Sequence, residues 1–183
     1  DQMRKLQGFT DEGSPGRDWN VATGMVIEGK AGFQIMGDWA KGEFTAAGKV
    51  PGVDYYCAAT PSNNGYLYNV DSFIFYKTSD PDKQEGQKLL AKLMMGKNFQ
   101  KVFNLYKGSI PARLDVPMDE FDKCAKTSNS DIKTAGASGG LVPSFAHGMA
   151  QGNTMKAALQ DVITEHFNSD MSSVDAANAL ADS

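Results

Sequence analysis

Short apolar runs bounded by turn residues recur through the first half of this chain. A run of roughly four to eight apolar residues between turn signals is typical of a strand buried on both faces. The pattern predicts such strands at residues 31–36, 55–59 and 72–76. The first run is followed by Gly37-Asp38-Trp39, and Asp71 stands just ahead of the third. We therefore expect Asp38 and Trp39 at the carboxyl end of a buried strand.

Beyond Pro81 the apolar positions change to helical spacing. One stripe consists of Leu89, Leu90, Leu93 and Met94, and a second consists of Phe99, Val102, Phe103 and Tyr106. Gly108 and Pro111 should end the second helix, with Lys107 at its C-terminal edge. Further helices are predicted over residues 18–28, 40–47, 118–126, 145–167 and 173–180. Residues 127–140 are rich in Thr, Ser, Asn and Gly, and we predict a mobile loop there.

Composition narrows the class of protein. The 183 residues are 41% hydrophobic, which is enough for the core of a single domain. The net charge is −4, and the 18 basic residues are scattered singly, so nucleic acid is not an expected partner. The longest apolar runs fall far short of the roughly 20 residues that a membrane-spanning helix needs. Because the chain opens inside an amphipathic pattern, we expect it to be part of a larger protein.

The two cysteines and the remaining motifs suggest no cofactor. Cys57 and Cys124 are far apart, form no C-x-x-C pair and lack His at metal spacing, so no zinc site is predicted. The pair is compatible with one long-range disulfide of an exported protein or with two buried thiols. A phosphate loop and a nucleophile elbow are both absent from the sequence.

Four short segments place a ring or a polar group beside Gly, Pro or a turn. They are Gly37-Asp38-Trp39, Asn69-Val70-Asp71-Ser72-Phe73, Lys107-Gly108-Ser109-Ile110-Pro111 and Ser144-Phe145-Ala146-His147-Gly148. Backbone is exposed at such places, and their side chains can converge on a ligand. The chemistry suits a sugar, whose hydroxyls both donate and accept and whose CH-rich face lies flat on an indole.

The order of three segments resembles a known family. Asp18-Trp19-Asn20, residues 28–39 and Lys107-Gly108-Ser109-Ile110-Pro111 resemble the solute-binding proteins of bacterial ABC sugar importers, most closely the glucose-binding members. The resemblance covers nearly the whole chain, but the family is about twice as long. It implies that residues 1–183 are a C-terminal lobe without its N-terminal lobe. The implied fold is α/β: a type II periplasmic-binding-protein lobe with a short, mostly parallel sheet flanked by helices and a helical C-terminal part.

The resemblance also implies roles for four residues. Trp39 matches the stacking aromatic, Asp71 the carboxylate that accepts from sugar hydroxyls, Lys107 the ammonium that donates to them, and His147 the imidazole near the cleft. Each also has a structural interpretation: a Trp over a helix–sheet seam, a turn-forming Asp, a helix C-terminal cation and a His in a first helical turn. If the resemblance holds, all four should gather beyond the carboxyl ends of the strands.

Further expectations follow from the family. Its members are exported to the periplasm, which favours a Cys57–Cys124 disulfide, and they deliver a monosaccharide to a membrane permease without turning it over. The alternative is a glycan-acting hydrolase, which needs two carboxylates flanking the scissile bond. Asp38, Glu43 and Asp71 are available for that role, but nothing in the sequence selects a pair. We therefore predict a binding protein.

Overall fold

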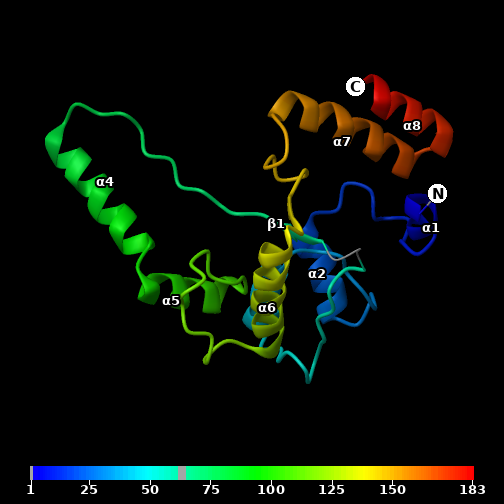
Figure 1. Ribbon diagram of the computed structural model, residues 1–183. Coiled ribbons are helices and arrows are strands. Elements are labelled where there is room, and N and C mark those ends of the chain that lie inside the picture. Colours follow the sequence, from blue (N-terminus) through cyan, green and yellow to red (C-terminus); the bar gives the residue numbers. More distant parts are fainter. Residues whose placement is uncertain (1, 62–64) are drawn as a thin grey trace. The chain divides into compact units, whose positions relative to one another are not determined.

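The computed structural model describes residues 2–61 and 65–183 (Figure 1). Their backbone clusters into two compact units. The first, here called the terminal unit, comprises Asp1–Arg17, Leu67–Asn69 and Val142–Ser183; the second, the central unit, comprises Asp18–Tyr66 and Val70–Leu141. Helices dominate both, and none of the helices in the described ranges has the length and apolar character needed to cross a bilayer.

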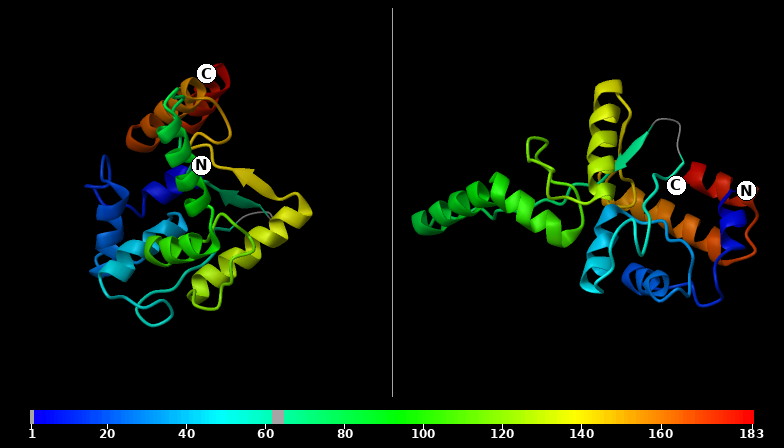
Figure 2. Two further views of the ribbon diagram at one scale, coloured as in Figure 1. Left: turned by 90° about the vertical axis from the view of Figure 1, so that its left-hand side faces the viewer. Right: turned by 90° about the horizontal axis from the view of Figure 1, so that it is seen from below.

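The terminal unit is built from three helices. They are α1 (Gln2–Gln7), α7 (Asn153–Asn168) and α8 (Ser173–Asp182). α7 and α8 lie side by side (Figure 2), and the Arg4 guanidinium of α1 donates to the carbonyls of Ser169 and Met171 between them, at 2.8 and 2.7 Å. Ser172 caps α8 by accepting from the Asp175 amide at 3.0 Å, so the helix predicted over 173–180 is confirmed.

The start of α7 differs from the prediction. We expected a helix from residue 145, but α7 begins at Asn153. Residues 144–149 instead form turns closed by the bonds from Gly148 N–H to the Phe145 carbonyl (2.9 Å) and from Met149 N–H to the Ser144 carbonyl (3.0 Å). Gly148 has a φ of +71°, which no helix continues through. His147 therefore lies in a turn rather than in a helix.

Two short parallel strands form the sheet. β1 (Tyr66–Tyr68) pairs with β2 (Leu141–Pro143), and together with the helices they give the α/β class expected from the sequence. The pairing bonds run from Tyr66 N–H to the Gly140 carbonyl at 2.9 Å and from Ser144 N–H to the Tyr68 carbonyl at 2.8 Å. Neither β1 nor β2 coincides with a predicted strand.

The three strands predicted from apolar runs are wrong in the described structure. Residues 31–36 and 72–76 are extended but pair with no strand, and Tyr55 makes a single bridge to Pro51. Hydrogen bonds to neighbouring helices hold these segments instead: the Gln34 side chain of the first segment donates to the Trp19 carbonyl of α2 at 2.9 Å, and Gln87 of α4 donates to the Tyr76 carbonyl of the second at 2.8 Å. An apolar run becomes a strand only where another backbone lies beside it, and here none does.

The helices of the central unit largely confirm the prediction. They are α2 (Trp19–Ile27), α3 (Lys41–Ala46), α4 (Pro81–Met94), α5 (Lys97–Lys107) and α6 (Lys123–Ser138), with a 3-10 turn, η1 (Asp38–Ala40), before α3. Gly29, at a φ of +72°, follows the end of α2, and Gly108, at +87°, ends α5 just after Lys107. Asp18 occupies the N-cap position of α2, but its side chain makes no capping bond.

The mobile loop predicted over residues 127–140 is wrong for most of its length, because α6 occupies Lys123–Ser138. Asp122 starts this helix by accepting from the Ala125 amide at 2.9 Å, and Gly139 ends it in the left-handed region at a φ of +73°. Thr134 bonds back to the Ser130 carbonyl at 3.0 Å. The hydroxyl side chains that suggested a loop are thus accommodated on a helix surface.

A small core and one disulfide hold α6 in place. Val116, Phe121 and Ala125 are buried together, with Leu105, Ile110 and Met118 packed against them. Cys57 and Cys124 form the disulfide, with their Cα atoms 5.7 Å apart, so this pairing is confirmed. It ties the extended segment around Cys57 to the first turn of α6.

Replacing Cys57 and Cys124 by alanine should lower the free energy of unfolding by about 4 kcal/mol, because the bridge spans 67 positions of sequence and restricts the unfolded chain. Urea denaturation of the oxidised chain and the double variant measures this. The chemically reduced chain is the control and should unfold like the variant. Two reactive thiols in the unreduced, denatured chain would contradict the bridge.

Candidate functional site

Trp39 is held in η1 by its own backbone. The indole folds back over Gly37, where an added Cβ would lie only 2.1 Å from the Trp39 Cζ3 atom. No residue but glycine fits at this position without moving the ring. The Trp39 side chain is half-buried. The Gly37-Asp38-Trp39 motif therefore fixes the orientation of one aromatic ring at the start of α3.

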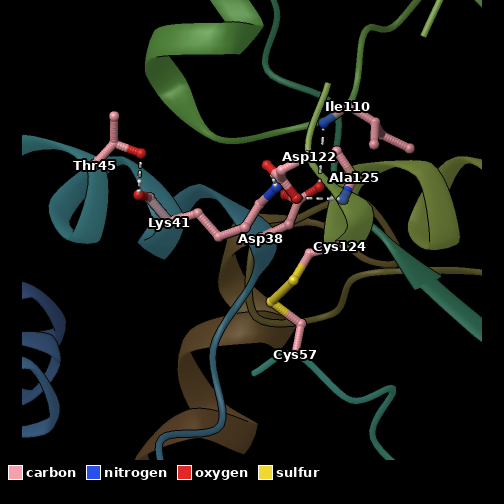
Figure 3. Close-up of polar contacts among 8 residues, drawn as sticks. All are labelled: Asp38, Lys41, Thr45, Cys57, Ile110, Asp122, Cys124 and Ala125. Carbon is pink, nitrogen blue, oxygen red and sulfur yellow. Dashed lines mark hydrogen bonds and ion pairs between the residues drawn. A yellow bond between two sulfur atoms is a disulfide. The ribbon is translucent and has the colours of Figure 1, made fainter. Parts of the chain in front are cut away.

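Asp38 joins this turn to the loop after α5. The Asp38 carboxylate accepts from the Ile110 amide at 3.2 Å (Figure 3). It also accepts from the Ser109 hydroxyl. Burial raises the pKa of Asp38, while the Ile110 bond, the Lys41 charge and the Ser109 bond act in the opposite direction. The sequence placed Asp38 beside Trp39 but assigned it no binding role. The long separation between Asp38 and Ile110 is why no local signal revealed the contact.

Asp71 and Lys107 form an ion pair. The Lys107 side chain is 31% exposed and the Asp71 side chain 64% exposed, so solvent reaches both groups. Lys107 Nζ also lies 5.7 Å from the centre of the Phe103 ring. The structure thus presents a donor and an acceptor together, which is what two neighbouring hydroxyls of a ligand require. Sequence reasoning did not assign Phe103 to the site.

The first turn of α3 packs tightly on the end of α5. A Cβ added to Gly42 would lie 2.9 Å from the Lys107 carbonyl oxygen, and one added to Gly108 would lie 2.7 Å from the Gly42 amide. The Lys107 charge also acts to lower the pKa of Asp38. Trp39, Asp38, Lys107 and, through its ion pair, Asp71 therefore belong to one neighbourhood of the central unit.

An ion pair between Lys41 and Asp122 links α3 to the start of α6. Lys41 is the first residue of α3, and its side chain is 7% exposed. Its ammonium donates to Asp122 at 2.7 Å, and Asp122 also caps α6 (Figure 3). Burial acts to raise the pKa of Asp122, but the hydrogen bonds from Lys41 and Ala125 outweigh it and the pKa is lowered. The pair links α3 to α6 beneath the Trp39 turn.

His147 lies in the terminal unit, in the turn after β2. Its ring is exposed, and Nδ1 lies 2.7 Å from the Ser144 hydroxyl, whose residue is buried. This bond sets the orientation of the ring. The expectation that His147 shares a face with Trp39, Asp71 and Lys107 stays a prediction. The other histidine, His166, is buried in α7, with Nε2 3.2 Å from the Ser173 hydroxyl.

A shallow apolar hollow of about 530 Å³ adjoins Lys107 on α5. It is lined by Phe99, Val102, Phe103, Tyr106 and Lys107, the apolar stripe expected from the sequence. Across residues 2–61 and 65–183 there is no group of three or more His, Cys, Asp or Glu side chains placed to hold a metal ion.

No protein-family model matches the chain. It is 48% identical over 181 residues to a probable sugar-binding periplasmic protein of Brucella suis, covering 98% of this chain and 43% of that protein. A protein of the same description from Rhizobium meliloti is 45% identical over 98% of this chain and 44% of its own length. An uncharacterized ABC transporter extracellular-binding protein of Pyrococcus horikoshii is 32% identical over 88% of this chain and 35% of its own length. The chain thus spans less than half of these relatives.

Asp122→Ala should lower the free energy of unfolding by about 3 kcal/mol or more, because the buried Lys41 ammonium loses its counter-charge. Asp80→Ala is the matched control: Asp80 caps α4, accepting from Asp82 and Lys83, and its loss should cost only about 1 kcal/mol. Denaturant titration of both variants compares them. Equal losses would show that the Lys41 pair adds nothing beyond a helix cap.

The same ion pair predicts a pH dependence. The pKa of Asp122 in the folded chain lies below the ordinary value of 3.8. Its contribution to stability is therefore fully present above pH 3.8 and is lost as the pH falls through the folded pKa. Acid unfolding curves should show this loss, and Lys41→Met should diminish it. An unchanged acid dependence in Lys41→Met would contradict the assignment.

Proposed function

We propose that this chain forms half of the sugar-binding cleft of an ABC importer's substrate-binding protein. The observation that carries the proposal is the neighbourhood of Trp39 and the Asp71–Lys107 pair at the junction of α3 and α5. One rigid aromatic ring beside a charged acceptor and a charged donor is the combination that a pyranose requires. The printed descriptions of the Brucella and Rhizobium relatives support the same class of ligand.

Each residue has a defined role in this proposal. The face of a monosaccharide stacks on the Trp39 indole, and its hydroxyls donate to Asp71 and accept from Lys107. Because Asp71 and Lys107 already pair with each other, a sugar must bridge or displace that contact, and the pair keeps both groups extended toward the ligand until then. The role of His147, which lies in the terminal unit with its ring oriented by Ser144, stays a prediction from the sequence. A glucose-like sugar is our proposed ligand.

The remaining partners follow from the relatives. They are about twice as long as this chain, so we propose that a second lobe supplies the opposing half of the cleft. The protein acts in the periplasm, as the descriptions of those relatives state for them, and delivers the sugar to the membrane subunits of the importer. The Cys57–Cys124 disulfide suits such an oxidising compartment.

Binding without turnover is favoured over glycan hydrolysis. A hydrolase needs two carboxylates that face the same bond across an open cleft. Asp38 is instead committed to Ile110 and Ser109, and Asp71 to Lys107. The relatives compared above are also described as binding proteins. Incubation with aryl glycosides should therefore release no chromophore.

The isolated chain should bind glucose with a dissociation constant of about a millimolar or weaker, because each hydrogen bond to a hydrated sugar has a net worth of only about 0.5 to 1.5 kcal/mol. Trp39→Ala should abolish this binding through loss of the stacking face. Trp19→Ala, which removes the other indole, is the matched control and should bind as before. NMR titration with a panel of monosaccharides measures all three. A micromolar constant for the monomeric chain would show that the site needs no second lobe.

Lys107→Met should separate affinity from stability. Solvent-exposed ion pairs stabilise a fold by only about 0 to 1 kcal/mol, so the free energy of unfolding should hardly change. Loss of a charged donor should weaken sugar binding about tenfold or more. Lys101→Met is the control, because the Lys101–Glu120 pair on the same helix has matching exposures of 29% and 63%. Equal affinities for the two variants would remove Lys107 from the site.

A further inference from the structure

We propose that Asp38 is a positioning residue that couples the Trp39 ring to the Lys107 end of α5, so that both meet one sugar at a fixed separation. This inference rests on the proposed function. Asp38 itself need not touch the ligand. Its role is to join two segments that are far apart in the sequence, one carrying the aromatic surface and the other carrying the ammonium.

The contacts of Asp38 connect the two segments directly. Asp38 begins η1, the turn that contains Trp39, and its carboxylate accepts from Ile110 at 3.2 Å and from Ser109. Ser109 and Ile110 follow Gly108, where α5 ends in the left-handed conformation immediately after Lys107. A shift of the 109–110 backbone relative to η1 would break these bonds. The carboxylate therefore limits how far Lys107 can move relative to Trp39.

Close contacts of three glycines also fix the position of η1 and α3 relative to the end of α5. The Gly108 backbone lies so close to Gly42 that an added Cβ would be 2.7 Å from the Gly42 amide, and Gly37 lies against the Trp39 ring. These contacts resist compression, while the Asp38 bonds resist separation. Tight packing and a directional hydrogen bond together fix the distance between the ring and the ammonium, which reduces the conformational entropy lost when a rigid ligand binds.

The coupling should depend on the ionisation of Asp38. Two charged groups face Asp38, Lys41 from α3 and Lys107 from α5, and the neutral phenol of Tyr66 on β1 is also close to it. Burial raises the Asp38 pKa, so the carboxylate becomes protonated at a higher pH than a solvated aspartate would. A protonated carboxyl accepts more weakly from Ile110 and Ser109. Sugar affinity should therefore fall as the pH falls through the Asp38 pKa.

Asp38→Asn tests the coupling with minimal change of shape. Removing the charge should weaken glucose binding about tenfold, because hydrogen bonds to charged groups are roughly twice as strong as neutral ones. It should also remove the Asp38 component from the pH profile of the dissociation constant. Ser109→Ala, which deletes one partner of the carboxylate, should give a smaller loss in the same direction. Glu28→Gln is the control, since it removes an exposed carboxylate paired only with exposed Lys30.

A second measurement needs no sugar. In the unliganded chain, the NMR shift of the Ile110 amide should titrate with Asp38, and this titration should vanish in Asp38→Asn but persist in Glu28→Gln. If wild type fails to bind any sugar, the proposed function is wrong. The Ile110 titration then still decides whether Asp38 holds the loop after α5 against η1. If wild type binds and Asp38→Asn matches its affinity and pH profile, the positioning role is overturned. An Ile110 amide shift that does not change with pH would also overturn the positioning role.

Discussion

The approach of α3 to the C-terminal end of α5 is the constraint on which the candidate site depends. Gly42 and Gly108 let the two backbones meet at a distance that any side chain would prevent. Because Trp39 precedes α3 and Lys107 ends α5, this single contact brings an aromatic ring and a cation together from segments far apart in the sequence. The left-handed conformation of Gly108 then directs the following loop back toward Asp38.

Polar contacts and a disulfide, more than apolar burial, fix α3 and the start of α6 relative to each other. The buried apolar cluster next to α6 is small: Val116, Phe121 and Ala125 are buried together, with Leu105, Ile110 and Met118 packed against them. Alongside it stand the Lys41–Asp122 ion pair and the Cys57–Cys124 disulfide, all meeting at the start of α6. A buried ion pair contributes little net stability, but it strongly penalises any arrangement that separates its partners. The Lys41–Asp122 pair therefore helps to keep α3, and with it Trp39 and Asp38, in a fixed position.

Several large apolar residues outside this part of the central unit are exposed to solvent. Phe33 is 96% exposed and Ile74 is 77% exposed, and both lie in extended segments that the sequence predicts as buried strands. Their apolar composition is that of strands, but a strand needs a second backbone to pair with. Exposed apolar surface of this kind is typical of an interaction surface. It agrees with the proposal that the chain works together with a second lobe.

The sequence by itself determined most of the helices, because apolar spacing, caps and glycines are local signals: Gly29 and Gly108 stop α2 and α5 where expected. For α6 the Ser- and Thr-rich composition outweighed the local signals of Asp122 and Gly139, and a loop was predicted. The sequence also indicated Trp39 and Lys107, since each stands beside a glycine at the end of an element. Tertiary structure alone decided that Asp71 pairs with Lys107 and that Asp38 is bound to Ile110. It also decided that the apolar runs are not strands. In each of these cases the outcome depends on which distant group lies alongside, and no local pattern of residues encodes that.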